Sequence, residues 1–400
     1  MTVQPPVRPR RLFLVALVAV TGLGPLAMQI FVPALPLIQV DYRVSTGTAQ
    51  LGLSLAMLAI AVSTLVYGPL SDRLGRRPVV LAGLWIYLVG SLACVLAPSI
   101  EVLILGRVVQ ATGATAGMVL SRAMVRDIYP QEKVAGALAA IAIAMSAAPM
   151  IGPAIGGELT DRLGWRAIFG FGAAVGFGVL LLAQWRLRET RPARRDPPGL
   201  GAMLADMRLL FGSARFNGYA WGGAFGHSVF FSFFAAAPYL MVNSLGRPAR
   251  EYGYYFVGIL IAFMAGSGVA VRWSERLGGD RMVMVGSAIA VSGAGLALAL
   301  ALAGVLSPAS LFLPTALTLF GMGPVMANLQ AGALGVHPHA AGSASGLIVF
   351  LQMGLGAVFA QLVGLLQDGT PLPMTGFMAA AVLMTFATFL IAWRANRRAA

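Results

Sequence analysis

Residues 68–77 read Gly-Pro-Leu-Ser-Asp-Arg-Leu-Gly-Arg-Arg, a charged stretch between two long apolar runs. Gly75 predicts a tight turn there, because glycine adopts unusual backbone angles at little steric cost. The Ser-Asp-Arg-Leu-Gly of residues 71–75 recurs as Ser-Glu-Arg-Leu-Gly at 274–278, an offset of 203, and as Thr-Asp-Arg-Leu-Gly at 160–164, an offset of 89. A segment that recurs in this way indicates internal duplication.

The chain around these segments is too apolar for a water-soluble domain. Of its 400 residues, 58% are hydrophobic and 10% are charged, against about 25% charged in soluble proteins. Its apolar runs match a hydrocarbon layer ~30 Å thick, and the lack of period-2 alternation favours helices over a barrel. The sequence predicts an all-α membrane protein with twelve transmembrane helices: Leu12–Leu37, Ala49–Leu70, Val79–Ala97, Val102–Leu120, Ala135–Leu159, Ala167–Trp185, Gly218–Met241, Tyr254–Val271, Met282–Val305, Ser310–Gly335, Ala344–Leu366 and Thr375–Trp393.

The three copies of the motif occupy equivalent loops. Two of them follow the second span of each half, and the copy at 160–164 lies three spans after the first, on the other membrane face. Inverted three-helix repeats within two six-helix halves have this arrangement. We therefore expect two pseudo-symmetric six-helix bundles joined by a linker: an N-terminal bundle over 1–187, a cytoplasmic linker over 188–215 and a C-terminal bundle over 216–400.

The net charge of +14 raises the question of a nucleic-acid partner. With an even number of spans, 22 of the 28 basic residues fall on the side of the two termini, five fall on the opposite side, and Arg107 lies within a span. This asymmetry is the positive-inside rule. It predicts cytoplasmic termini and no nucleic-acid partner.

The loop at 68–77 resembles the signature that follows helix 2 in the major facilitator superfamily, almost position for position. The resemblance implies the major facilitator fold and a gating role for Gly68, Asp72, Arg73, Gly75, Arg76 and Arg77. Physically, Gly68 can admit a neighbouring helix. Asp72 can pair with nearby arginines and with a helix N-terminus as the halves move. The alternative is a positive-inside loop with ordinary helix caps.

Arg107, with Gln110 one turn later, resembles the helix-4 motif of the same superfamily, in which the arginine is linked to proton handling. A charge inside a span is costly, and such residues are functional candidates by default. If the helix starts near Glu101, Arg107 lies ~9 Å below the membrane surface. The alternative is that Arg107 snorkels to the interface.

Residues 152–157, Gly-Pro-Ala-Ile-Gly-Gly, resemble the helix-5 pattern of antiporters. The resemblance assigns Gly152, Pro153, Gly156 and Gly157 to that motif. Proline bends a helix and small residues allow close packing. A generic packing face would have the same composition, so that alternative stays open.

Within the superfamily the chain most resembles the Bcr/CflA (bicyclomycin-resistance) type of drug:proton antiporter. The segments that carry this resemblance are 24–27, 31–36, 164–166, 341–345 and 351–354. Members often have an aspartate in helix 1 where this chain has Gln29. Gln29 lies seven residues, or ~10 Å, inside Pro36, so it can hydrogen-bond Arg107 or substrate but cannot titrate.

No carboxylate is expected near the middle of any span, which leaves the proton-coupling group open. His227 lies ~18 Å from Arg215 by helical rise, close to the midplane, and histidine changes charge near neutral pH. The alternative is a neutral histidine bonded to a neighbouring helix. Glu158 is a second candidate, expected at the wet end of helix 5. Asn328, Gln330 and Gln352 are expected either to line a central cavity or to join helices.

These features predict a secondary active transporter that exports drug-like molecules in exchange for protons by alternating access. An uncoupled facilitator or uptake carrier for a small metabolite is the alternative, supported by Gln29. Three histidines and one cysteine offer no catalytic or metal cluster, so we expect no enzyme activity, no metal and no cofactor beyond the coupling proton. The expected partners are a small-molecule substrate and the lipid bilayer, for a monomer in the bacterial inner membrane.

Overall fold

The computed structural model describes residues 11–191 and 200–399, and every regular element in these ranges is helical. The helices are α1 (Arg11–Phe31), continued by η1 (Val32–Ala34) and α2 (Leu35–Tyr42), then α3 (Thr46–Leu74), α4 (Arg76–Val95), α5 (Ile100–Ile128), α6 (Gln131–Leu163), α7 (Arg166–Arg186), α8 (Leu200–Gly212), α9 (Ala214–Tyr239), continued by η2 (Leu240–Ser244), α10 (Ala249–Leu277), α11 (Gly279–Leu302), α12 (Pro308–Val336), η3 (Pro338–Ala340), α13 (Ala341–Leu366) and α14 (Leu372–Ala399).

Twelve of these helical stretches are long and apolar enough to cross a membrane, as predicted. Most of them extend beyond the predicted spans because polar turns continue the helices past their apolar centres, but α4 ends at Val95 and α11 at Leu302, before the predicted ends at Ala97 and Val305. The helix α8 is too short to cross a membrane and lies in the predicted linker. It is joined to the start of α13 by a 2.6 Å hydrogen bond from Ser343 to Asp206.

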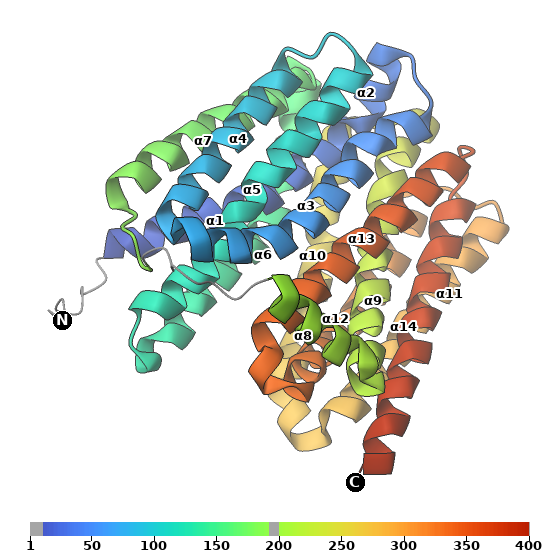
Figure 1. Ribbon diagram of the computed structural model, residues 1–400. Coiled ribbons are helices and arrows are strands. Elements are labelled where there is room, and N and C mark those ends of the chain that lie inside the picture. Colours follow the sequence, from blue (N-terminus) through green and yellow to red (C-terminus); the bar gives the residue numbers. More distant parts are fainter. Residues whose placement is uncertain (1–10, 192–199, 400) are drawn as a thin grey trace, which may run out of the picture.

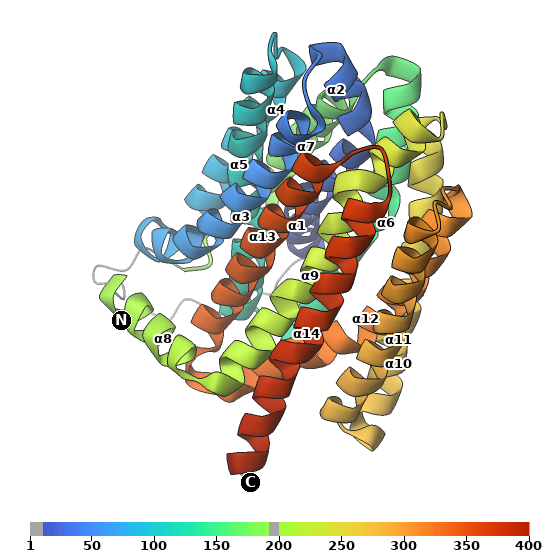
Figure 2. The ribbon, with the colours of Figure 1, turned by 90° about the vertical axis from the view of Figure 1, so that its right-hand side faces the viewer.

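The helices form two groups (Figure 1). In the first, α1 packs on α5 and α6, and α4 packs on α5 and α7; in the second, α9 packs on α13 and α14, and α12 packs on α10 and α11. The groups touch mainly along two helix pairs, α3 with α13 and α6 with α10. Figure 2 shows α13 running beside α3. We call the groups the N-terminal and C-terminal bundles.

The three copies of the charged motif end three helices in the same way. Gly75, Gly164 and Gly278 have φ of 92°, 83° and 84°, a region that favours glycine. Each donates its N–H to the carbonyl of the first motif residue, at 3.0 to 3.1 Å. The predicted turn at Gly75 is therefore present, and the motif works as a helix stop in all three places.

Glycine pairs show that the two bundles repeat one packing scheme. Gly113 of α5 lies so close to Gly83 of α4 that a Cβ would overlap its carbonyl, and Gly321 of α12 lies in the same way against Gly286 of α11. Two turns further along α4 and α11, Gly90 lies against the backbone of Gln110, as Gly293 lies against that of Thr318. Such contacts bring helix axes close together. We call them the glycine seams.

The bundles are joined at one end of the molecule. Figure 1 places the start of α1 and the end of α14 toward the same end of the molecule. We call this the terminus end, and the opposite end the distal end. Within the described residues, every hydrogen bond between the bundles lies in the distal half: Ser54 to Gln361, Gln361 to Gly47, Asn243 to Gln39, Tyr254 to Glu158, and Ala249 and Arg250 to Asp161.

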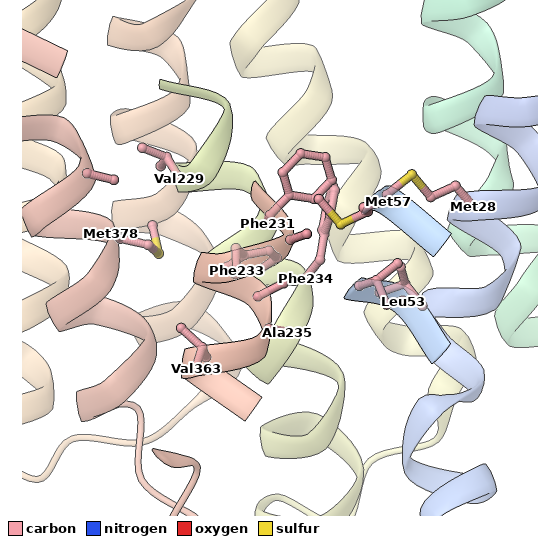
Figure 3. Packing of buried hydrophobic residues seen from close by; sticks show 14 of the residues in the cluster. Met28, Leu53, Met57, Val229, Phe231, Phe233, Phe234, Ala235, Val363 and Met378 are labelled. Carbon is pink, nitrogen blue, oxygen red and sulfur yellow. The ribbon is translucent and has the colours of Figure 1, made fainter. Parts of the chain in front are cut away.

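A hydrophobic plug adds to this contact. Met28 and Met57 of the N-terminal bundle lie beside Phe231 and Phe234 of α9 (Figure 3). All four side chains are buried and belong to one core cluster that spans both bundles. Because Met57 is closer to the start of α3 than to its end, the plug lies toward the distal end.

Candidate functional site

Arg107 lies buried inside the N-terminal bundle, with 2% of its surface exposed. Its Nη1 donates to the Gln110 side-chain oxygen at 2.6 Å and to the Ala27 carbonyl at 3.2 Å. Its Nε donates to the Gly52 carbonyl at 3.4 Å. The guanidinium carbon lies 4.2 Å from the centre of the Phe31 ring. Arg107 therefore does not snorkel to the interface; it joins α1, α3 and α5 around a buried positive charge.

Gln110 extends this contact into a short chain of hydrogen bonds. While its oxygen accepts from Arg107, its Nε2 donates to the Ser91 hydroxyl at 2.8 Å, and that hydroxyl donates to the Tyr87 carbonyl at 2.8 Å. Both ends of the amide are thus satisfied, which fixes its orientation. Arg107 and Gln110 also line a narrow pocket with Met28 and Ile60.

Among the described residues, the C-terminal bundle contains no equivalent of this hydrogen-bonded chain. In the glycine seams, Thr318 of α12 occupies the position equivalent to Gln110 of α5. Three residues earlier, Thr315 occupies the position equivalent to Arg107. Both threonines donate to carbonyls of their own helix, Thr315 to Leu311 at 2.7 Å and Thr318 to Pro314 at 2.8 Å. The buried charge is a property of one bundle only.

Gln29 does not bond to Arg107 in the described structure. Its side chain is 7% exposed, and its Oε1 is buried without a hydrogen-bond partner. Gly152 of α6 lies against the Gln29 Cβ, and Gly156 lies against the Ile30 carbonyl. The two glycines thus let α6 pack closely on α1 and enclose Gln29, while Arg107 takes main-chain carbonyls and Gln110 instead.

The other two residues of the helix-5 motif face the opposite bundle. Gly157 lies against the backbone of Arg250, and the Pro153 carbonyl lies against Gly253 of α10. The motif therefore packs α6 on two helices at once, one in each bundle. This is the close packing that the residue types predicted; a link to transport direction stays a prediction.

Asp72 and Arg76 lie in a charge cluster at the terminus end of the N-terminal bundle. Arg76 pairs with Asp72 at 3.0 Å and with Asp127 of α5 at 3.3 Å, and Arg191 lies 3.6 Å from Asp72. The pairing of Asp72 with arginines is thus as expected, and all of these partners belong to residues 72–191. In this conformation Asp72 has no partner in the C-terminal bundle among the described residues.

The α4 N-terminus is capped by a residue that the sequence analysis did not single out. Glu189 accepts hydrogen bonds from the backbone N–H groups of Arg76 at 2.9 Å and Arg77 at 3.1 Å. The helix dipole also stabilises a carboxylate at this N-terminus. The Arg77 side chain donates to the Leu187 and Gln184 carbonyls. The sequence shows that charged residues follow α7, but it does not show what Glu189 binds, because its partner lies more than a hundred residues away in sequence.

Gly68 and Arg73 differ from the expectation. A side chain at Gly68 would meet no atom within 4 Å, so the predicted close approach of another helix is wrong for this conformation. Arg73 is exposed and makes no hydrogen bond or ion pair with the described residues. Both residues lie near the end of α3 at the terminus end, away from the contacts that join the bundles at the distal end.

His227 lies deep in α9 and is only partly buried. Its Nδ1 is 3.2 Å from the Gly223 carbonyl, one turn earlier in the same helix. A neighbouring helix, which the alternative required, supplies no bond to it among the described residues. Gln352 of α13 is 6% exposed, with its Nε2 beside Gly223, so both polar groups lie near one turn of α9.

Of the two roles expected for Asn328, joining helices or lining a cavity, the structure shows the first. The Asn328 amide donates to the Ser274 hydroxyl at 3.2 Å, on the second copy of the charged motif, and to the Pro324 carbonyl at 2.8 Å. Asn328 therefore joins helices at the terminus end. Gln330 is exposed and makes no hydrogen bond with the described residues. Helical periodicity alone could not tell whether Asn328 bonds to a neighbouring helix or lines a cavity.

Glu158 lies at the distal end, as expected. Its carboxylate pairs with Arg162 at 2.7 Å and accepts a hydrogen bond from the Tyr254 hydroxyl of the other bundle. No group of three or more histidine, cysteine or acidic side chains that could hold a metal ion occurs within residues 11–191 and 200–399.

The fold and the sequence both match known transporters. The profile of the Major Facilitator Superfamily matches residues 17–361. The chain belongs to this superfamily. It is 33% identical to multidrug resistance protein D of Escherichia coli over 94% of this chain and 93% of that protein. It is 27% identical to a bicyclomycin resistance protein homolog of Haemophilus influenzae over 94% of each chain.

A solved transporter structure shares the fold. A bacterial homolog of the human lysosomal transporter Spinster, in an inward-facing and unoccupied conformation, aligns with a TM-score of 0.74 at 18% identity, over 96% of each chain. Together with the relatives, this likeness confirms the twelve-helix major facilitator fold and the resemblance to the bicyclomycin-resistance type. The protein is thus a multi-pass transporter of the bacterial inner membrane.

Proposed function

We propose that this transporter exports drug-like amphipathic molecules in exchange for protons. The observation that carries the proposal is the buried guanidinium of Arg107, held at 2.6 Å from Gln110 and 4.2 Å from Phe31. An unpaired charge in the membrane interior is costly, so its retention favours a role in transport over a role in packing. The relatives named for multidrug and bicyclomycin resistance support a drug-like substrate.

We further propose that both termini lie in the cytoplasm. The excess of arginine at the terminus end supports this orientation. The distal end is then periplasmic, and the hydrogen bonds and the hydrophobic plug at that end close the molecule on the periplasmic side. The proposed moving units are the bundles over 1–187 and 216–400, joined by the linker over 188–215, in a monomer.

For the coupling proton we propose His227. The spans hold no carboxylate near their centres, and arginine does not deprotonate in proteins. Histidine can gain and lose a proton in the physiological range. Because the only described bond of the His227 ring is to its own helix at Nδ1, Nε2 stays available to a proton or a substrate.

The test is a proton-flux assay on purified protein in liposomes with a lumenal pH dye and an imposed gradient. We expect a transported compound to dissipate the gradient in the unaltered protein and not in Arg107→Ala. His227→Gln, which keeps a polar side chain that cannot titrate, should move the compound without moving protons. His339→Gln, at an exposed position, serves as the matched control.

Two outcomes would contradict the proposal. If compounds cross while the gradient of the unaltered protein is untouched, the protein is an uncoupled facilitator, as the missing helix-1 carboxylate would favour. If His227→Gln still dissipates the gradient, the proton uses another group.

A further inference from the structure

The contact between α3 and α13 at the distal end combines close packing with hydrogen bonds. Gly47 of α3 lies so close to Leu365 of α13 that a Cβ would overlap its side chain. Ser54 donates to the Gln361 side-chain oxygen at 2.7 Å, and the Gln361 nitrogen donates to the Gly47 carbonyl at 3.0 Å. Both ends of the Gln361 amide therefore hold the two bundles together. We call this contact the α3–α13 seam, and its residues are Gly47, Gln50, Ser54, Gln361, Gly364 and Leu365.

Gln50 lies in the same seam but does not bond across it. Its side chain is 0% exposed, and neither its Oε1 nor its Nε2 has a hydrogen-bond partner among the described residues. Gly364 of α13 covers the side chain, because a Cβ at Gly364 would lie 2.8 Å from both Cβ and Cγ of Gln50. The amide gives up water when the seam forms, and no described residue replaces it. A buried amide without partners destabilises the state that buries it.

The internal duplication shows that the fold does not need an amide at this position. The helices α3 (Thr46–Leu74) and α10 (Ala249–Leu277) have the same length and differ by the motif offset of 203. The equivalent of Gln50 is therefore Gly253, which lies against the Pro153 carbonyl of α6 in the other contact between the bundles. That contact closes at this position by main-chain packing, without a polar side chain, so packing alone does not account for Gln50.

We infer that Gln50 weakens the distal closure, so that the bundles separate at that end readily enough for the transport cycle. The inference rests on the proposed movement of the two bundles and adds a residue that sets its equilibrium. When the seam opens, water reaches the Gln50 amide and restores its hydrogen bonds, whereas Ser54 and Gln361 lose theirs. The two glutamines of one seam thus have opposite effects: Gln361 favours the closed arrangement, and Gln50 favours the open one.

Distances between spin labels test this inference. Labels on Leu96→Cys and Val305→Cys, in a Cys94→Ser background, report the separation of the bundles at the distal end by electron–electron resonance in liposomes. Leu96 follows α4 and Val305 follows α11, and both side chains are exposed. Gln50→Leu keeps an apolar side chain of similar size and removes the amide. The ratio of long to short distances should then fall at least about fivefold, equivalent to about 1 kcal/mol.

Gln361→Leu is the matched control, because it makes the same exchange in the same seam. It removes the bonds to Ser54 and Gly47, so the ratio should rise instead. If long distances are rare in the unaltered protein, adding Gln50→Leu to Gln361→Leu should lower the ratio that Gln361→Leu has raised. Gln50→Met, which is unbranched like glutamine, should act as Gln50→Leu does and separates loss of the amide from a change of side-chain shape.

A rise of the ratio in both Gln50→Leu and Gln50→Met would overturn the inference, because the amide would then stabilise the closed arrangement. An unchanged ratio would overturn it too, as would loss of folded protein in both variants. The measurement needs neither protons nor substrate, so its failure is distinct from failure of the proposed function. A protein whose distances shift as expected, but which does not dissipate a proton gradient, keeps this role of Gln50 and loses the coupling.

Discussion

The carboxylate of Asp161, in α6 of the N-terminal bundle, accepts a hydrogen bond at 3.2 Å from the backbone N–H of Ala249, at the start of α10 in the other bundle. The next N–H, of Arg250, binds the second carboxylate oxygen at 3.0 Å. Asp161 is the aspartate of the motif copy at 160–164, and Asp72 is its equivalent at the opposite end of the molecule. One aspartate crosses between the bundles at the closed end, while the other pairs within its own bundle.

Asp161→Asn should therefore favour separation of the bundles at the distal end. The amide loses the charge that favours a helix N-terminus, at a cost of about 1 kcal/mol, which changes the ratio of conformations about fivefold. Spin labels on Leu96→Cys and Val305→Cys, in a Cys94→Ser background, can report the distance across that end by electron–electron resonance. We expect the long-distance population to grow.

Asp41→Asn is the matched control for this experiment. Asp41 also lies at the distal end, but it accepts from the Trp165 indole at 2.9 Å and from Arg166, both within the N-terminal bundle. Its loss should leave the spin-label distances unchanged. An equal change in the two variants would contradict the role assigned to Asp161.

Arg107→Lys should inactivate transport nearly as fully as Arg107→Ala. Lysine keeps the charge, but it lacks the planar fork that reaches Gln110 and the two carbonyls of α1 and α3 together. We expect at least a tenfold fall in the transport rate, about 1.4 kcal/mol, with membrane insertion retained. Transport in liposomes and the yield of monodisperse protein check the two parts; full transport by either variant would contradict the role of Arg107.

Asp72→Asn should slow the transport cycle more than it weakens substrate binding. The substitution removes the 3.0 Å ion pair with Arg76 and the approach of Arg191, and these groups lie far from the pocket of Arg107. The ratio of turnover to apparent affinity, measured in proteoliposomes, separates the two effects. Unchanged turnover would show that the cluster does not gate.

Gly90→Ala should destabilise the N-terminal bundle. A Cβ at Gly90 would overlap the backbone of Gln110 and the Gly106 carbonyl, and separating α4 from α5 costs about 1–3 kcal/mol, as for other overpacked sites. Gly178→Ala in α7, where a Cβ meets nothing within 4 Å, is the control. Thermal unfolding in detergent should show a lower midpoint for Gly90→Ala alone.

Much of this architecture follows from patterns that are local in sequence. Apolar runs predict the spans, and the recurrence of residues 71–75 predicts the duplication and the helix stop at Gly75. Arg107 stands out because a charge inside an apolar run is rare. In each case the signal lies within one helix or one loop.

What local patterns miss is the choice of partner. Gln29 and Gln110 are both polar residues near the depth of Arg107, and only the packing of α1 on α6 decides that Gln110 is bonded and Gln29 is not. Glu189 caps a helix that begins 113 residues earlier. Asn328 looks like a cavity residue until the second motif copy is placed beside it.

The glycine seams have a consequence for how such a transporter can evolve. Because main chains touch along α4–α5 and α11–α12, these helices cannot accept larger side chains without losing stability, and their sequence is constrained before any question of substrate arises. Positions where an added side chain meets open space, such as Gly178 of α7, have no such constraint. Under antibiotic selection, changes that broaden or shift the range of exported compounds should accumulate outside the seams, while the seams stay as they are.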